Sequence, residues 1–333
     1  MYFLIGISLL FAFLFGVDLI ASVAATAIWS GLSRFAFGGN ARTRSSVIFA
    51  LRVVPMMAAM LFIFAFILPA YLLYEPVSSG ETVGYKLAVI ALISAAGLLA
   101  ALCRLFASWW RTRRLIADWM DCSEAVSIEG VTIPAFRMRH AFPVIAVVGV
   151  FRPRMFVAEQ ILSELSKSEL SAAIDHEMGH IGAHDNLKRI AMRICGDLLV
   201  LPLGKTLDRV WAEASEAAAD EYAATRGGAI SALNLASALV KIGRITPLEC
   251  GNALPSAAYL IERQDAALAT RIGRLLELAD SPATVNGRGN VRFPTAMWIT
   301  LAISAAIILP MAFNSSFLSA VHAMSEDLLA ILQ

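Results

Sequence analysis

The sequence has little charge and little cysteine. Only 16% of its 333 residues are charged, against roughly 25% in an average soluble protein, and 58% are hydrophobic. The four cysteines are scattered and form no CxxC pair, which argues against a disulfide scaffold and against a cysteine zinc site. The net charge of +1 gives no general field that would attract nucleic acid. These values predict a membrane protein with room for one additional folded domain.

Four apolar stretches are long enough to cross a bilayer, which takes about 20 helical residues. The predicted spans are about 2–33, 47–74, 87–107 and 292–313. The first stretch lacks the charged start of a signal peptide and is too long for one, so we expect it to be retained. Its only charge, Asp18, is either a functional group or the partner of another buried polar group.

The basic residues between these stretches predict the orientation. All the clustered basic residues fall on one side of the four spans: Arg34, Arg42, Arg44, Arg111, Arg113, Arg114, Arg288 and Arg292. The opposite side has a single Lys86, beside Glu75 and Glu81. Because positively charged loops stay in the cytosol, we expect residues 108–291 to be cytosolic and both termini to be extracytoplasmic. The tail, 314–333, is then a short extracytoplasmic segment. The expected location of the protein is a bacterial-type inner membrane.

The predicted cytosolic domain begins with short strands and continues with helices, which is the α+β class. The expected strands are Val126–Ile133, Val144–Val150 and Phe151–Val157. Ser166-Lys167-Ser168-Glu169 is a capping-box sequence that predicts a helix through His180. Further helical patterns cover 187–203, 206–226 (before Gly227-Gly228), 230–243 and 257–279.

The predicted capped helix contains His176-Glu177-Met178-Gly179-His180, an HExxH motif. Residues i and i+4 lie one turn apart on one helix face, so both imidazoles can reach one metal ion. Glu177 stands beside the first ligand, where its carboxylate can reach a water at the metal without binding the metal itself. Asp185 is predicted to support the site or to end the helix.

A catalytic zinc needs a third protein ligand, and the later segment Trp211–Tyr222 offers carboxylates for it. Glu216 and Asp220 are again four residues apart, so one can bind the metal while the other orients a ligand imidazole. Glu213 lies on nearly the same face and stays an alternative. Alanines and Ser215 surround these carboxylates, and their small size favours close approach of two helices.

Zinc at such a site hydrolyses peptide bonds: it acidifies water and polarises the scissile carbonyl, and Glu177 transfers the proton. The developing oxyanion needs a further donor. The candidates for that donor, or for the lining of the cleft, are Tyr222, Arg226 and His184. The predicted cofactor is one Zn²⁺, and the predicted partners are a protein or peptide substrate and the lipid bilayer, without nucleic acid.

The chain resembles the BlaR/MecR-type integral-membrane metallopeptidases, peptidase family fifty-six. Three spans before the motif carry the resemblance, together with VVGVFRPRMFVAEQILSELSKSELSAAIDHEMGHIGAHDN and WAEASEAAADEYAA. The resemblance implies a gluzincin-type site in which His176, His180 and Glu216 bind zinc, Glu177 is the base and Asp220 supports a ligand. Antibiotic-sensing members carry a sensor where about twenty residues stand here, so the resemblance implies no β-lactam receptor.

Three functions remain open at this stage. The first is a zinc endopeptidase that cuts a protein at the cytosolic membrane face, in regulatory signalling. The second is a quality-control protease of family forty-eight (HtpX and CAAX-protease type), which shares HExxH and the ExxxD helix. The third belongs to another class: a non-catalytic membrane transducer with a structural zinc.

Overall fold

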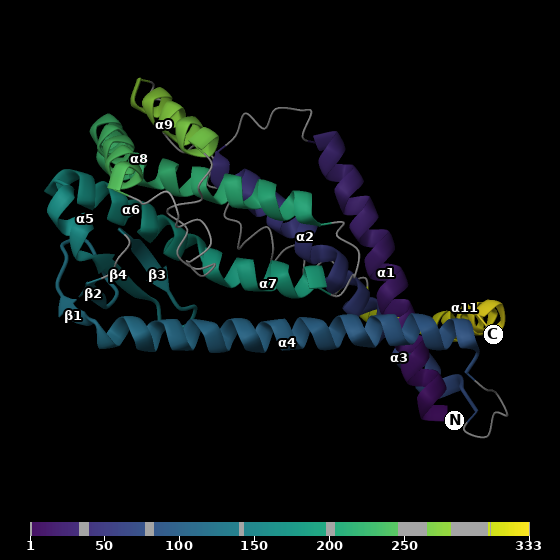
Figure 1. Cartoon of the computed structure of the whole chain (residues 1–333). Coiled ribbons are helices and arrows are strands. Elements are labelled where there is room, and N and C mark those ends of the chain that lie inside the picture. The colour runs from purple at the N-terminus through teal and green to yellow at the C-terminus, as the bar shows by residue number, and fades with distance from the viewer. Residues whose placement is uncertain are drawn as a thin grey trace.

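The structure, a computed structural model, describes most of the chain. The described residues are 2–32, 40–76, 83–139, 143–197, 204–245, 265–280, 306 and 308–332. Long helices occupy the first three apolar stretches (Figure 1), as predicted. They are α1 (Tyr2–Leu32), α2 (Ala41–Phe62), which continues through a π-helical turn η1 (Ile63–Ile67) into α3 (Leu68–Tyr74), and α4 (Tyr85–Asp121).

Most of the predicted fourth span (292–305 and 307) lies outside the described residues, as do Arg34, Arg288 and Arg292 of the predicted basic loops. Within the described part of the chain, four helices are long and apolar enough to cross a membrane: α1, α2 with its continuation, α4 and α8 (Lys205–Ile245). Large apolar side chains cover the outer faces of the first three, with Phe3 77%, Ile20 72% and Leu92 69% exposed. Such exposed apolar surface indicates a multi-pass membrane protein.

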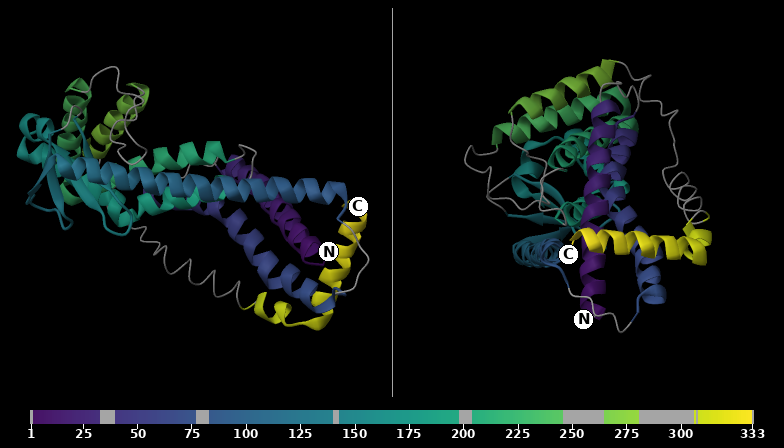
Figure 2. Two further views of the ribbon diagram at one scale, coloured as in Figure 1. Left: turned by 60° about the horizontal axis from the view of Figure 1, so that its bottom comes forward. Right: turned by 90° about the vertical axis from the view of Figure 1, so that its right-hand side faces the viewer.

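Helix α4 joins the predicted membrane part to the sheet. It does not end near residue 107, where the third span was expected to stop, but continues to Asp121 along the length of the molecule (Figure 2). Arg113 and Arg114 stack over Trp109 and Trp110, 4.8 and 5.2 Å from the ring centroids. At the far end Trp119 is buried in the core of the sheet domain. One continuous helix therefore links the two parts.

A four-stranded sheet precedes the site, as expected for an α+β domain. Its strands are β1 (Ser123–Val126), β2 (Ala135–Met138), β3 (Ile145–Val148) and β4 (Arg154–Ala158), in the order β1-β2-β4-β3. Only the β2–β4 pair is parallel. The predicted strand Val126–Ile133 is wrong, because Gly130 (φ 83°) forms the turn between β1 and β2.

The helices that follow the sheet are α5 (Glu159–Glu164), α6 (Lys167–Ala183), α7 (Asp185–Asp197), α8 and α9 (Asp265–Asp280). Of these, α5 and α6 contact the sheet, α8 packs against α6, and α9 packs against α8. The capping box at the start of α6 is confirmed: Ser166 Oγ accepts from Glu169 N–H (3.3 Å), and Glu169 Oε2 accepts from Ser166 N–H (2.8 Å). The helix ends at His184, which adopts a left-handed conformation (φ 58°).

Helix α8 covers two of the predicted helices. They are separated at Gly228 (φ 66°), where the Gly227-Gly228 pair predicted a stop and the helix bends instead. Of the helix expected at 257–279, the part before residue 265 lies outside the described residues. The last helix, α11 (Ser315–Leu332), turns Leu318, Val321 and Leu329 inward.

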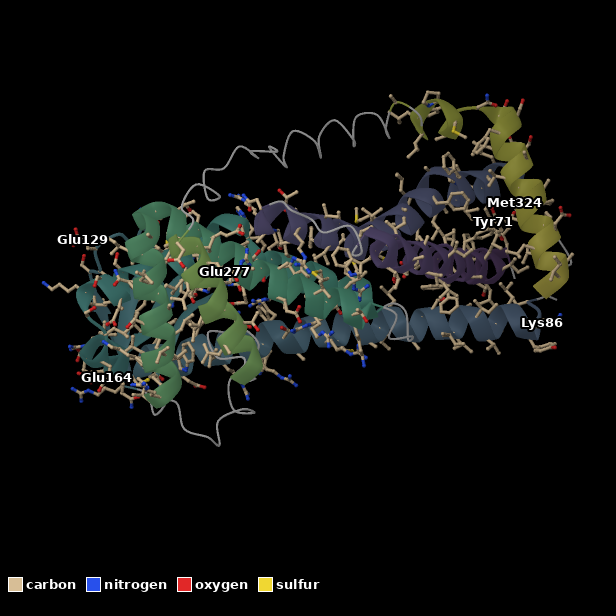
Figure 3. All side chains as sticks on the ribbon, turned by 90° about the horizontal axis from the view of Figure 1, so that it is seen from above. Tyr71, Lys86, Glu129, Glu164, Glu277 and Met324 are labelled. Carbon is tan, nitrogen blue, oxygen red and sulfur yellow. The ribbon has the colours of Figure 1, made fainter. Side chains whose placement is uncertain are left out.

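The described buried residues form separate cores. One lies between the sheet, α6 and α8, and another lies among α1–α4 and α11. A smaller cluster joins the two parts, and it contains Trp29 and Ile48 from the membrane helices with Met192, Leu207 and Trp211 from α7 and α8. Figure 3 shows charged side chains gathered at the sheet end, around Glu129, Glu164 and Glu277. The end of the molecule that contains the sheet is therefore its polar part.

Candidate metal centre

Helices α6 and α8 approach closely where the HExxH motif of α6 faces Glu216 and Asp220 of α8. A Cβ atom at Gly179 would lie 3.2 Å from the Cα atom of Ala219 and 3.2 Å from Cβ of Tyr222. Both distances are shorter than ordinary van der Waals contacts, so a glycine on α6 and an alanine on α8 bring the two backbones together. The small residues that surround the carboxylates in the sequence thus allow the approach that was predicted for them.

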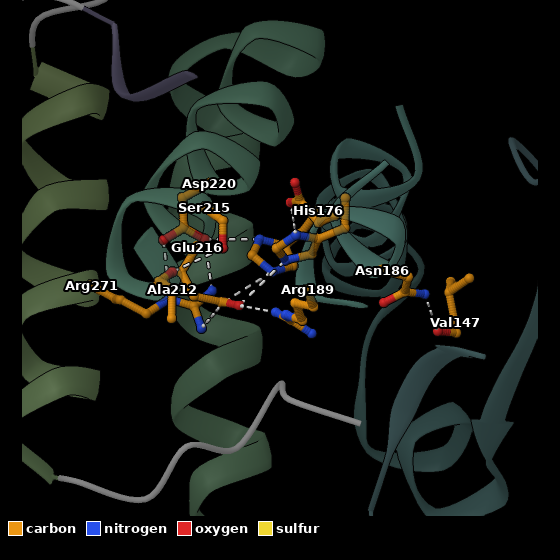
Figure 4. Close-up of polar contacts among 11 residues, drawn as sticks. Val147, His176, Asn186, Arg189, Ala212, Ser215, Glu216, Asp220 and Arg271 are labelled. Atoms are coloured by element: carbon orange, nitrogen blue, oxygen red, sulfur yellow. Dashed lines mark hydrogen bonds and ion pairs between the residues drawn. The ribbon is translucent and has the colours of Figure 1, made fainter. Parts of the chain in front are cut away.

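Three predicted ligands meet at this contact (Figure 4). Donor atoms of His176, His180 and Glu216 all lie within 4.8 Å of one another. Nε2 of His176 is 3.5 Å from Oε2 of Glu216, and Nε2 of His180 is 3.4 Å from Oε1. Two donors of a tetrahedral zinc ion, each about 2.1 Å from the metal, lie about 3.4 Å apart. The spacing of these atoms therefore fits zinc.

Burial gives a second reason to expect an ion at this position. His176 is fully buried, and its Nε2 atom makes no hydrogen bond among the described residues. A buried polar atom without a partner destabilises a fold by about 1–3 kcal/mol. A metal ion bound to Nε2 would satisfy this atom, so the donor set fits a metal on burial as well as on distance.

The other nitrogen of each imidazole faces a carboxylate. Nδ1 of His176 lies 2.9 Å from Oδ1 of Asp220, and Nδ1 of His180 lies 2.7 Å from Oδ2 of Asp185. Both carboxylates are almost completely buried. A carboxylate at Nδ1 favours the tautomer that leaves Nε2 free for a metal. Asp220 thus lies where the sequence placed a supporting carboxylate, and Asp185 supports the second histidine.

Arg271 of α9 completes the centre, and sequence reasoning missed it. Its Nη1 atom is 3.0 Å from Oε2 of Glu216, and its Nη2 and Nε atoms donate to both oxygens of Asp220 at 2.7 and 3.1 Å. This bidentate pairing fixes Asp220 and limits the rotation of Glu216. Residue 271 stands more than fifty positions from both carboxylates, so their spacing along the chain does not predict the contact.

The charges of the centre favour a cation. Burial raises the pKa of Glu216, but Arg271 and His180 outweigh burial and hold this pKa well below its usual range. Burial lowers the pKa of His180, yet Glu216 and Asp185 raise it to about 10. Glu216 therefore stays ionised and places negative potential at Nε2 of both histidines, where either a proton or a metal ion can bind.

Glu177 differs from these carboxylates. It is 7% exposed, and its carboxylate makes no hydrogen bond within the described part of the chain. Burial raises its pKa above the usual value, and the neighbouring His180 and His176 offset only part of that rise. A carboxylate with a raised pKa is a better proton acceptor than an ordinary one, so Glu177 is suited to move a proton at this centre.

Two other predicted candidates lie away from the donor atoms. Glu213, the alternative third ligand, is exposed and points to Arg209, whose Nε atom is 3.6 Å from its carboxylate. His184 is exposed at the end of α6. The rotation of α8 about its axis thus selects Glu216 over Glu213.

Tyr222 and Arg226, the remaining candidates, lie side by side on α8. Tyr222 packs against Gly179, next to the second half of the HExxH motif. Arg226 donates to the Tyr222 hydroxyl (3.3 Å) and pairs with Asp175 (2.8 Å), while its side chain stays 53% exposed. The pair borders the centre without joining the cluster of donor atoms.

Comparison with known proteins agrees with the geometry. Residues 141–246 match the sequence model of Peptidase family M48. No curated protein matches the chain. The matched stretch includes the HExxH helix and Glu216 and Asp220 of α8, and it gives no specific support to the BlaR/MecR type. The match and the donor geometry together identify a zinc metallopeptidase domain in a chain with membrane helices.

Proposed function

We propose that the protein is a membrane-bound zinc endopeptidase that hydrolyses peptide bonds of a protein substrate at the cytosolic membrane face. His176, His180 and Glu216 bind the metal in this proposal, and Glu177 is the catalytic base. The observation that carries it is the position of Glu216, whose carboxylate oxygens lie 3.4–3.5 Å from the Nε2 atoms of both histidines.

The chain's own residues divide the work among them. A bound zinc ion would supply Lewis-acid chemistry, by acidifying water and polarising the scissile carbonyl. The Glu177 carboxylate accepts a proton from the attacking water and delivers it to the leaving amine. Asp220 and Asp185 hold the two imidazoles with Nε2 toward the metal. Arg271 holds Asp220 and Glu216 in place.

Contacts between α2 and α8 support cleavage close to the bilayer. The N–H of Ala41, the first residue of α2, donates to Oε2 of Glu221 at 2.9 Å. Glu221 follows Asp220 directly in the chain and also pairs with Arg274 of α9. The start of the second apolar helix is thus attached to the residue next to the centre, and a substrate that reaches the centre passes near the membrane surface.

The proposed topology follows the basic loops. Residues 108–291 form the cytosolic domain, both termini are extracytoplasmic, and 292–313 is the fourth span. We do not count α8 as a span, because it carries Glu216 and Asp220 to the centre and bends at Gly228. Labelling of single cysteines on each side of sealed vesicles tests this arrangement.

Two kinds of peptidase fit this site. The match to Peptidase family M48 supports a quality-control protease of the HtpX and CAAX-protease type at least as well as a BlaR/MecR-type signalling protease. The three helices before the motif are the feature in favour of the BlaR/MecR type. Their substrates separate them: a quality-control enzyme degrades many misfolded membrane proteins, whereas a signalling enzyme cuts one regulator at one position.

The test compares the wild type, Glu177→Gln and the control Glu213→Gln, all purified in detergent. Zinc content and cleavage of unfolded casein are measured for each. We expect equal zinc in all three, wild-type cleavage in the control, and a loss of at least about a hundredfold in Glu177→Gln. Cleavage by Glu177→Gln at the wild-type rate would refute the assignment of the base. Bound zinc without cleavage by any of the three would favour a non-catalytic transducer.

A further inference from the structure

A second group of metal-binding side chains lies at the opposite end of the molecule. Glu75 directly follows α3, and His322 and Glu326 lie one turn apart on α11. One donor atom from each lies within 4.8 Å of the other two. In Figure 3 Tyr71 and Met324 mark this end, and Glu164 and Glu277 mark the end that contains the sheet. The group is therefore separate from the candidate metal centre.

The group is buried although it is polar. The Glu75 side chain is 2% exposed and the His322 side chain 17%. Nδ1 of His322 and Oε1 of Glu326 are both buried, and neither makes a hydrogen bond among the described residues. The carboxylates of Glu75 and Glu326, which have oxygen atoms within 4.8 Å of each other, repel unless a proton or a cation lies between them. A positive ion between them would satisfy both carboxylates, including the unpaired Oε1 of Glu326.

We propose that Glu75, His322 and Glu326 bind a divalent transition-metal ion, with zinc as the best fit. One imidazole and two carboxylates form a donor set that zinc accepts. The imidazole disfavours calcium and magnesium, which prefer oxygen ligands alone. The spacing of His322 and Glu326 places both on one face of α11, as in the HExxH helix.

The surrounding contacts hold the group almost ready for an ion. Nε2 of His322 is 3.9 Å from Oε2 of Glu75, about half an ångström more than the spacing of two tetrahedral zinc ligands. The rings of Tyr74 and His322 stack with their centroids 5.9 Å apart. The Tyr74 hydroxyl donates to the Ser315 carbonyl oxygen at 2.9 Å. A small shift of α11 toward α3 thus closes the site, and the bound ion ties the C-terminal helix to the end of the second apolar segment.

The test uses the full chain in detergent with His176→Ala and His180→Ala, which remove two ligands of the candidate metal centre. This background is stripped with chelator, and zinc alone is added back and counted. We expect about one zinc ion per chain in the background, about one with Asp327→Asn added and none with Glu326→Gln added. Asp327 is the exposed neighbouring carboxylate on α11 and serves as the control.

Cobalt substitution in the same background gives a second measurement. Cobalt bound by an imidazole and carboxylates absorbs visible light in a way that loosely held ions do not, so the band is expected in the background and absent with Glu326→Gln. Far-ultraviolet circular dichroism verifies that the variants are folded, and His322→Gln replaces Glu326→Gln should the latter unfold. A background without zinc, or equal zinc with Glu326→Gln and with Asp327→Asn, would overturn the second site. Neither result depends on peptidase activity.

Discussion

Replacing Asp185 by asparagine tests the supporting role of this carboxylate in the candidate metal centre. Oδ2 of Asp185 lies 2.7 Å from Nδ1 of His180, and the residue is 3% exposed. A hydrogen bond to a charged group in such a position contributes about 1.5–3 kcal/mol. Asparagine keeps an acceptor but removes the charge, so His180 becomes a weaker ligand.

The expected result is a 10–100-fold increase in the zinc dissociation constant, which corresponds to about 1.4–2.7 kcal/mol. Competition with a zinc-binding dye measures it on the detergent-purified full chain. Because Asp185 acts through His180, saturating zinc is expected to restore most of the cleavage. Asp175→Asn is the matched control, since this carboxylate lies on α6, as His180 does, and pairs with Arg226 outside the donor cluster.

Two results would refute this reasoning. An unchanged dissociation constant in Asp185→Asn would mean that the contact with His180 contributes nothing to metal binding. A loss of cleavage that saturating zinc does not restore would mean that Asp185 acts on the substrate or on the fold rather than on the ligand.

Three further predictions concern the same domain. Burial raises the pKa of Glu169, but hydrogen bonds from Lys241 and Ser237 outweigh burial and lower this pKa to about 2. Above pH 4.5, Glu169→Gln should therefore lower the free energy of unfolding by about 1–3 kcal/mol. This difference from the wild type should vanish as the pH falls toward 2, and a constant difference in unfolding midpoints across that window would contradict it. Gly179→Val should push α8 away from α6, since even a Cβ there meets Ala219 at 3.2 Å, and weaken zinc binding at least about tenfold in the dye assay, whereas wild-type affinity would show that the helices need not approach. Zinc at a thousand times its dissociation constant stabilises the folded state by about 4 kcal/mol, so removal of zinc by a chelator should lower the unfolding temperature. An unchanged unfolding temperature in a calorimetric scan would argue against a bound metal.

Local sequence patterns determined several features correctly. The capping box at Ser166 started the predicted helix, and the HExxH spacing placed His176 and His180 on one face of it. The lengths of the apolar stretches predicted the helices of the first three spans. All these features depend on neighbours within one helical turn, or on the thickness of a bilayer, so a linear pattern contains them.

The tertiary structure decided what depends on the packing of separate elements. Glu216 and Glu213 are equivalent in a linear pattern, and the orientation of α8 against α6 places only Glu216 beside the histidines. The partner of Asp220, Arg271, comes from α9, so its contact appears only once the two helices are packed together. His322 and Glu326 stand four residues apart in the sequence, but folding brings Glu75 to them from a distant part of the chain. Contacts of this kind form across helices, and their distances follow from how side chains of different sizes pack rather than from spacing along the chain.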